Sequence, residues 1–168
     1  MSWYALYTKP RHEKKVYSYL LEKDFIAFLP LVERVRQWKD RKMRIEVPLF
    51  SSYVFSDFNY RNRFEILQTQ GVIKIIHFRG KPAVIPDWQI DSLKKMLESP
   101  ATLRLERYVR PGEMAEVMTG PFKGLKGMVD KRKNEHRLIL TIDGIMQSVS
   151  VEIDIDSVKK IKLETAIS

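Results

Sequence analysis

The chain has 168 residues, no cysteine and a formal net charge of +9, with 44% hydrophobic and 30% charged residues. This balance is typical of a folded globular protein, and the lack of cysteine excludes disulfides, thiolate metal sites and a cysteine nucleophile. No apolar run approaches the roughly 20 residues of a membrane-spanning helix, and the N-terminus lacks a signal-peptide layout, so we expect a cytoplasmic protein without membrane contact. The first 100 residues hold 18 basic and 11 acidic side chains and carry most of the positive excess. That excess favours nucleic-acid binding, although a merely soluble basic surface would look the same.

The first hundred residues alternate between strand and helix patterns. Strands are predicted at residues 3–8, 25–29, 48–55 and 72–78, and helices at 12–23, across 60–67 and from 86 toward 99. In the second helix Tyr60, Phe64 and Leu67 are expected to share one apolar face. Residues 32–38 and 43–47 flank a charged tip at 39–42, which predicts a basic β-hairpin arm.

Beyond Ser99 no helical period is sustained. Short strands are predicted at residues 114–118, 128–131, 138–142 and 147–151, separated by turn residues at 120–121, 134–135 and 143–144, a spacing that favours a small barrel. We therefore predict an α+β domain over residues 1–99, with an antiparallel sheet flanked by helices. A linker over 100–107 and an all-β barrel domain over 108–163 complete the predicted organisation.

No constellation of residues predicts catalysis. The three histidines lie far apart without metal-ligand spacing, and there is neither a glycine-rich phosphate loop nor a nucleophile elbow. A nucleic-acid-processing enzyme would also need acidic metal ligands at a plausible spacing, which the sequence does not offer. We expect no enzyme, no metal site and no cofactor.

Binding residues are more evident than catalytic ones. Two groups of cations suit a phosphate backbone: Lys9, Arg11, Lys14 and Lys15 near the first helix, and Arg34, Arg36, Lys39, Arg41, Lys42 and Arg44 in the hairpin. A solvated charged arm would explain the second group equally well. An aromatic set consists of Tyr7, Phe50, Tyr53 and Phe55, and strand alternation puts Tyr53 and Phe55 on one face. From the pattern alone, this set is either core or an apolar pocket that faces a partner.

Three spaced blocks resemble the N-terminal (NGN) domain of NusG-type transcription factors: residues 3–9 (WYALYTK), residues 48–55 (PLFSSYVF), and residues 71–72 (GV) followed by residues 80–82 (GKP). The resemblance implies docking on the clamp helices of the largest RNA polymerase subunit, beside upstream or non-template DNA. By position it implies polymerase contact by Tyr7, Phe50, Tyr53, Phe55 and Ile75. The sequence departs from the commoner pattern at Ser51 and Ser52, where many relatives have Pro-Gly or Pro-Asn.

A second resemblance covers the C-terminal part. Residues 110–112 (RPG), a strand and then residues 120–129 (GPFKGLKGMV) resemble a KOW motif, with the characteristic residues Gly120, Pro121, Phe122, Gly124 and Gly127. It implies a five-stranded SH3-like barrel that contacts nascent RNA and either a ribosomal protein or a termination factor. Residues 36–42 (RQWKDRK) and 133–138 (KNEHRL) resemble the UpxY-like antiterminators of surface-polysaccharide operons.

The chain is therefore expected to be a monomeric elongation or antitermination factor that suppresses pausing or termination. The alternative is a KOW-containing RNA-binding or ribosome-associated protein. Co-purification separates the two, because the first would bring down polymerase subunits and the second ribosomal RNA.

Overall fold

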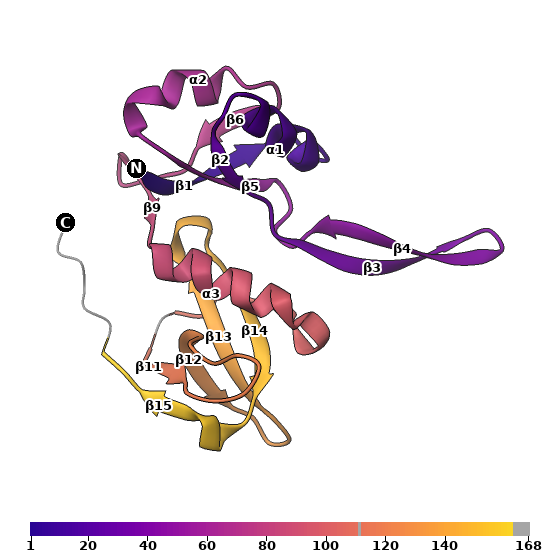
Figure 1. Cartoon of the computed structure of the whole chain (residues 1–168), viewed down its shortest axis with the longest axis vertical. Coiled ribbons are helices and arrows are strands. Elements are labelled where there is room, and N and C mark those ends of the chain that lie inside the picture. Colours follow the sequence, from indigo (N-terminus) through magenta and orange to yellow (C-terminus); the bar gives the residue numbers. More distant parts are fainter. Residues whose placement is uncertain (111, 163–168) are drawn as a thin grey trace. The chain divides into compact units, whose positions relative to one another are not determined.

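The computed structural model describes residues 1–110 and 112–162 (Figure 1). The chain forms two compact units, Met1–Asp87 and a second that begins at Trp88. This division differs from the predicted boundary after residue 99. All of helix α3 (Asp87–Glu98) except its first residue belongs to the second unit. The predicted end of the second domain, residue 163, lies outside the described residues. The mixed α/β region followed by a β-rich region is confirmed.

The first unit is built on an antiparallel sheet with β1 near its centre. The strand order is β2-β5-β1-β6, and β9 pairs with β1 beside β6. The strands are β1 (Ser2–Thr8), β2 (Ile26–Phe28), β5 (Tyr53–Phe58), β6 (Val72–Ile75) and β9 (Val84–Ile85). β1 is apolar almost throughout and pairs with a neighbouring strand along both edges.

Helices α1 (Glu13–Glu22) and α2 (Arg63–Leu67) bury apolar side chains against one face of this sheet. Val16 and Leu20 come from α1, as the four-residue spacing predicts. A short 3-10 turn, η1 (Tyr60–Asn62), leads into α2. The predicted stripe of Tyr60, Phe64 and Leu67 is wrong, because Ile66 is the fully buried residue while Phe64 is 62% and Leu67 39% exposed.

The predicted strand over residues 48–55 is interrupted by a turn. Pro48 ends β4 (Arg41–Pro48), and β5 begins only at Tyr53. Ser52 in the turn has a φ of 67°, a left-handed conformation that glycine and asparagine adopt more readily than serine. The Ser52 backbone N–H donates to Oε1 of the buried Glu13 at 2.8 Å, and the Ser52 carbonyl accepts from the Thr8 N–H at 2.9 Å. These two bonds position the turn despite its serine.

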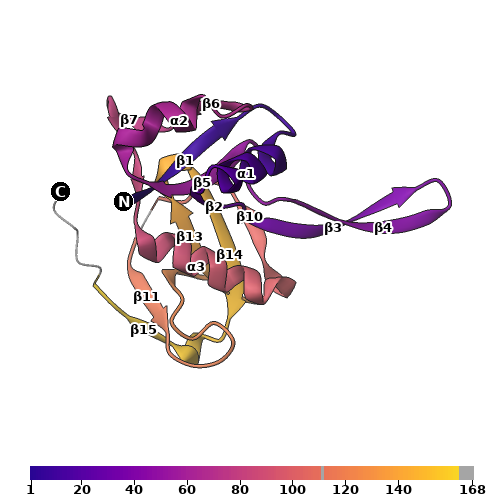
Figure 2. The same cartoon turned by 45° about the horizontal axis from the view of Figure 1, so that its top comes forward.

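The predicted basic hairpin is confirmed as β3 (Leu31–Trp38) paired with β4. Figures 1 and 2 both show it extending away from the sheet of the first unit. Every residue from Glu33 to Arg44 is exposed, so the outer hairpin is held by its cross-strand pairing and not by a core. A shorter hairpin joins β7 (His77–Phe78) and β8 (Lys81–Pro82).

The second unit contains α3 and a six-stranded antiparallel sheet of order β10-β14-β13-β12-β11-β15. Its strands are β10 (Arg104–Glu106), β11 (Met114–Val117), β12 (Lys126–Lys131), β13 (His136–Ile142), β14 (Gln147–Ile153) and β15 (Val158–Lys160). The four strands predicted from the sequence correspond to β11 to β14. The two outer strands were not predicted. They add one strand to the five that the resemblance implied.

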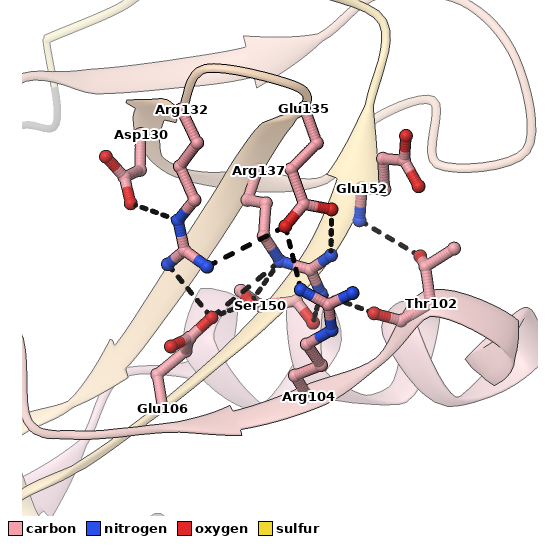
Figure 3. A network of polar contacts seen from close by, with 9 residues as sticks. All are labelled: Thr102, Arg104, Glu106, Asp130, Arg132, Glu135, Arg137, Ser150 and Glu152. Atoms are coloured by element: carbon pink, nitrogen blue, oxygen red, sulfur yellow. Dashed lines mark hydrogen bonds and ion pairs between the residues drawn. The ribbon is translucent and has the colours of Figure 1, made fainter.

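The segment predicted as a linker is fixed to the sheet of the second unit. It contains a 3-10 turn, η2 (Pro100–Thr102), and then β10, which pairs with β14. Figure 3 shows a polar network that joins this segment to β13 and β14. Arg137 is fully buried at its centre and donates to the carbonyl oxygens of Thr102 and Ser150 and to a carboxylate oxygen of Glu135. Residues 102–106 are therefore part of the folded unit and not a free tether.

Candidate functional site

Tyr7 and Tyr53 form an aromatic pair on the face of the sheet opposite the α1 and α2 core. They are cross-strand partners on β1 and β5, with ring centroids 5.6 Å apart, and both are half-buried. Lys74 on β6 is the partner of Tyr7 on the other side and holds its ammonium group 5.7 Å from the Tyr7 ring centroid. Partial burial, and secondarily the neighbouring Tyr7, raises the pKa of the Tyr53 hydroxyl above its usual value. We call these three side chains the tyrosine patch.

Two other members of the predicted aromatic set lie in the interior. Phe55 is fully buried and Phe50 is 1% exposed, and their ring centroids lie 6.2 Å apart in an edge contact. Phe28 stacks on the other side of Phe55 at 6.2 Å. Phe55 follows Tyr53 on the same strand face, as alternation predicts, but a partner cannot reach it. Phe50 and Phe55 are therefore interior residues and not part of the tyrosine patch.

Ile75 also departs from the expectation of an exposed contact residue. It pairs with Leu6 and is 2% exposed within the core cluster that includes Val16 and Leu20. It therefore lies on the helix-covered face of the sheet, opposite the tyrosine patch. The residue that does flank Tyr7 from β6 is Lys74. Finding it would have required the register of β6 on β1, which includes an irregularity between Tyr7 and Thr8.

The basic residues near the start of α1 are all exposed. They are Lys9, Arg11, Lys14 and Lys15. The Lys14 ammonium donates to the Glu46 carbonyl oxygen of β4 at 2.7 Å and so links the first helix to the inner part of the hairpin. Glu13, beside it, anchors the turn that precedes Tyr53. The sequence offered no signal for either long-range contact, because both partners are backbone groups.

The hairpin cations divide between two faces. Cross-strand partners point to the same face of a two-stranded ribbon, and the register pairs Arg36 with Met43 and Trp38 with Arg41. Lys42 pairs with Gln37 and Arg44 with Val35 on the opposite face. Lys39 lies in the tip with a φ of 35°. The single basic cluster expected from the sequence is thus split by the strand geometry.

Four of the residues expected to form the KOW motif, Gly120, Pro121, Phe122 and Gly124, lie in the loop between β11 and β12, and Gly127 lies in β12 itself. Gly120 and Gly124 have φ values of 85° and 89°, which a side chain would strain. Gly127 is needed for close approach, because a Cβ there would lie 2.6 Å from the Ile139 carbonyl oxygen. Pro121 and Phe122 lie in the loop, exposed and half-buried respectively. The preceding block of residues 110–112 includes residue 111, which lies outside the described residues.

The loop that carries this motif is closed by backbone hydrogen bonds. The Gly124 N–H donates to the Val117 carbonyl at 2.7 Å, and the Val117 N–H donates to the Leu125 carbonyl at 2.9 Å. Leu125 is fully buried. The loop is therefore a fixed surface and not a slack connection.

Metal chemistry finds no support in the part of the chain that the structure describes, where no three His, Asp or Glu side chains are grouped to hold an ion. Nor is any described helix long and apolar enough to cross a bilayer. What the arrangement offers is a half-exposed aromatic patch, a basic hairpin and a rigid glycine-rich loop.

A family model described as NusG, transcription termination factor nusG, matches residues 1–94, which is more than half of the chain. The chain belongs to the NusG family. It is similar to the transcription termination/antitermination protein NusG of Pseudomonas aeruginosa, with 26% identity over 175 residues that cover 95% of this chain and 98% of that protein. The resemblance to NusG-type transcription factors noted from the sequence is thereby confirmed. This family comprises transcription factors and is not a family of enzymes.

Two solved structures are also similar along nearly the whole chain. A structure described as the domain interaction in Thermotoga maritima NusG has a TM-score of 0.47 and 21% identity, and covers 96% of this chain and 97% of that one. The MjSpt4:Spt5 complex in conformation B has a TM-score of 0.30 and 16% identity, with coverages of 97% and 99%.

Proposed function

We propose that this NusG-family chain binds the clamp helices of the largest RNA polymerase subunit through the tyrosine patch and suppresses pausing or termination. The observation that carries the proposal is the half-buried Tyr7–Tyr53 pair on two central strands of the family-matched unit. Rings already fixed by a sheet lose little conformational entropy when a partner covers them. Aromatic residues of this kind contribute about 2 kcal/mol or more at interface hot spots.

The mechanism requires no bond chemistry by this chain. A bound factor favours elongation only if it binds the elongating polymerase more tightly than the paused one. The hairpin and the cations near α1 contribute contacts to upstream or non-template DNA. Residues 1–99 act as the polymerase-binding region, and the KOW region carries a second contact, to nascent RNA, a ribosomal protein or a termination factor. We assign the factor to a specific class of operons, of the surface-polysaccharide type, and expect it to act as a monomer in the cytoplasm.

The test measures retention of the purified chain on immobilised RNA polymerase. The double variant Tyr7→Ala with Tyr53→Ala should bind at least about 30-fold more weakly, which is the equivalent of one 2 kcal/mol hot spot. Phe64→Ala is the matched control, because Phe64 is a 62% exposed aromatic on α2 outside the patch. Thermal unfolding is recorded for each variant.

Two outcomes contradict the proposal. In the first, the double variant binds like the control while remaining folded. In the second, unfolding collapses with binding, which would make the tyrosines core residues. If instead ribosomal RNA co-purifies with the chain and polymerase does not, the alternative of a ribosome-associated KOW protein is favoured.

A further inference from the structure

The two faces of the β3–β4 hairpin differ in charge and chemistry. One face, which we call the tryptophan face, carries Arg34, Arg36 and Trp38 from β3 and Arg41, Met43 and Ile45 from β4. It holds three cations and no acid. The opposite face carries Glu33, Val35, Gln37, Lys42, Arg44 and Glu46, whose two acids balance its two bases. The positive charge of the hairpin strands is therefore concentrated on one face, together with the single aromatic ring.

The side chains of the tryptophan face are available to a partner. Trp38 is 63% exposed and Met43 37% exposed, beyond the reach of the sheet core. The ion pairs found in residues 1–110 and 112–162 involve none of the three arginines. An exposed indole beside unpaired guanidinium groups presents a stacking surface and phosphate-binding donors side by side.

We propose that the tryptophan face binds single-stranded nucleic acid, with an unpaired base stacked on Trp38 and phosphates held by Arg34, Arg36 and Arg41. An indole ring stacks on any base, but only a base that is not already stacked in a duplex offers its full face. Arginines two residues apart on a strand are about 6.7 Å apart, a spacing suited to successive phosphates of an extended strand. The absence of acids on this face removes the repulsion that the opposite face would impose.

This inference refines the nucleic-acid contact in the proposed function and does not depend on polymerase binding. It assigns unequal roles to the hairpin cations. Arg36 and Arg41 lie on the binding face, whereas Lys42 and Arg44 lie on the neutral face and contribute only through the general field of the hairpin.

The experiment measures binding of the full chain to fluorescently labelled oligonucleotides by anisotropy, as a function of salt. The probes are a 12-nucleotide oligothymidylate, an oligouridylate of the same length and a DNA duplex of the same length. The first two distinguish DNA from RNA as the single-stranded ligand. Vesicles containing an anionic phospholipid are a further probe, since arginine and tryptophan also suit a lipid surface.

Trp38→Ala is expected to weaken single-strand binding by about 5- to 150-fold, the equivalent of one stacked base, and to change duplex binding little. Val35→Ala is the matched control: Val35 is also 63% exposed, but lies on the opposite face, and its loss should leave affinity within about twofold. Arg36→Gln with Arg41→Gln should reduce the salt slope by about 1.4, from two phosphate contacts on a single strand, and Lys42→Gln with Arg44→Gln should reduce it less.

Equal losses for Trp38→Ala and Val35→Ala would overturn the inference, as would duplex binding as tight as single-strand binding, or binding to vesicles without binding to oligonucleotides. Because all these residues are exposed, the variants should keep the unfolding temperature of the parent chain. Trp38→Ala should also keep its affinity for polymerase if the tyrosine patch is the polymerase site. Loss of single-strand binding by the tryptophan face and loss of polymerase binding by the tyrosine patch can therefore be distinguished.

Discussion

Arg137 is the largest fully buried side chain among the described residues, and replacing it with methionine removes a charge while keeping most of the volume. The variant would leave the carbonyl oxygens of Thr102 and Ser150 without their guanidinium donor. Each unsatisfied buried acceptor costs about 1–3 kcal/mol. Removing one partner of a buried ion pair costs about 3–5 kcal/mol in total.

The lower end of that range applies, because both carboxylates keep another arginine. Glu135 retains Arg104 at 2.7 Å, and Glu106 retains Arg132 at 3.1 Å. Arg137→Met should therefore lower the free energy of unfolding of the second unit by about 3 kcal/mol. Arg104→Met is the control, since its side chain is 58% exposed and its ion pair contributes about 0.2–1 kcal/mol.

Hydrogen exchange is the suitable assay, because it resolves the β10 amides from the rest of the chain. Protection of residues 104–106 should fall by about two orders of magnitude in Arg137→Met, and chemical denaturation should show an earlier transition. If the free energy of unfolding fell by less than about 1 kcal/mol and the β10 amides stayed protected, the polar network would not be what holds residues 102–106 on the sheet.

Two further predictions concern the second unit. Gly127→Ala should lower the free energy of unfolding by about 2–3 kcal/mol in chemical denaturation, because the added Cβ would meet the Ile139 carbonyl oxygen. Gly112→Ala should lower it clearly less, because its Cβ would meet only the flexible end of Met128 at 2.9 Å, and equal losses of stability in the two variants would refute the reasoning. Partial burial acts to raise the pKa of Glu135, but the hydrogen bonds from Arg137 and Arg104 outweigh burial, so the pKa of Glu135 is lowered from its usual value. The unfolded chain then binds more protons than the folded chain as pH falls below about 4.5, so the stability from Glu135 is present above that pH and lost below it. In Glu135→Gln, the denaturation midpoint should fall less steeply as the pH is lowered through the acidic range. An unchanged pH dependence would contradict the lowered pKa of Glu135.

Much of the fold could be predicted because it follows from local patterns. The four-residue spacing of Val16 and Leu20 identified α1, and turn residues at 120–121, 134–135 and 143–144 separated the strands of the second unit. The core-facing residues of α2 were misassigned, because a five-residue helix that follows a 3-10 turn is too short for its apolar spacing to show which face is buried. β10 was missed because a three-residue edge strand depends on its partner β14 and on Arg137, neither of which is local.

The candidate site was predictable in its residue types but not in its exposure. Tyr53 and Phe55 share a strand face, as the alternation requires, yet one is half-buried and the other fully buried. The difference comes from Phe28 and Phe50, which cover Phe55 from β2 and from the turn before β5. A strand pattern specifies which face a side chain occupies, whereas access to a partner depends on elements distant in sequence.

The outer half of the β3–β4 hairpin contributes nothing to a core, since each residue from Glu33 to Arg44 is exposed. Substitutions there escape the packing constraint that limits change elsewhere in the first unit, and each should alter stability by less than about 0.5 kcal/mol. The surface of the arm can therefore be altered while the sheet that carries the tyrosine patch keeps its geometry. Changes to this surface can accumulate at little cost to the fold that holds the arm.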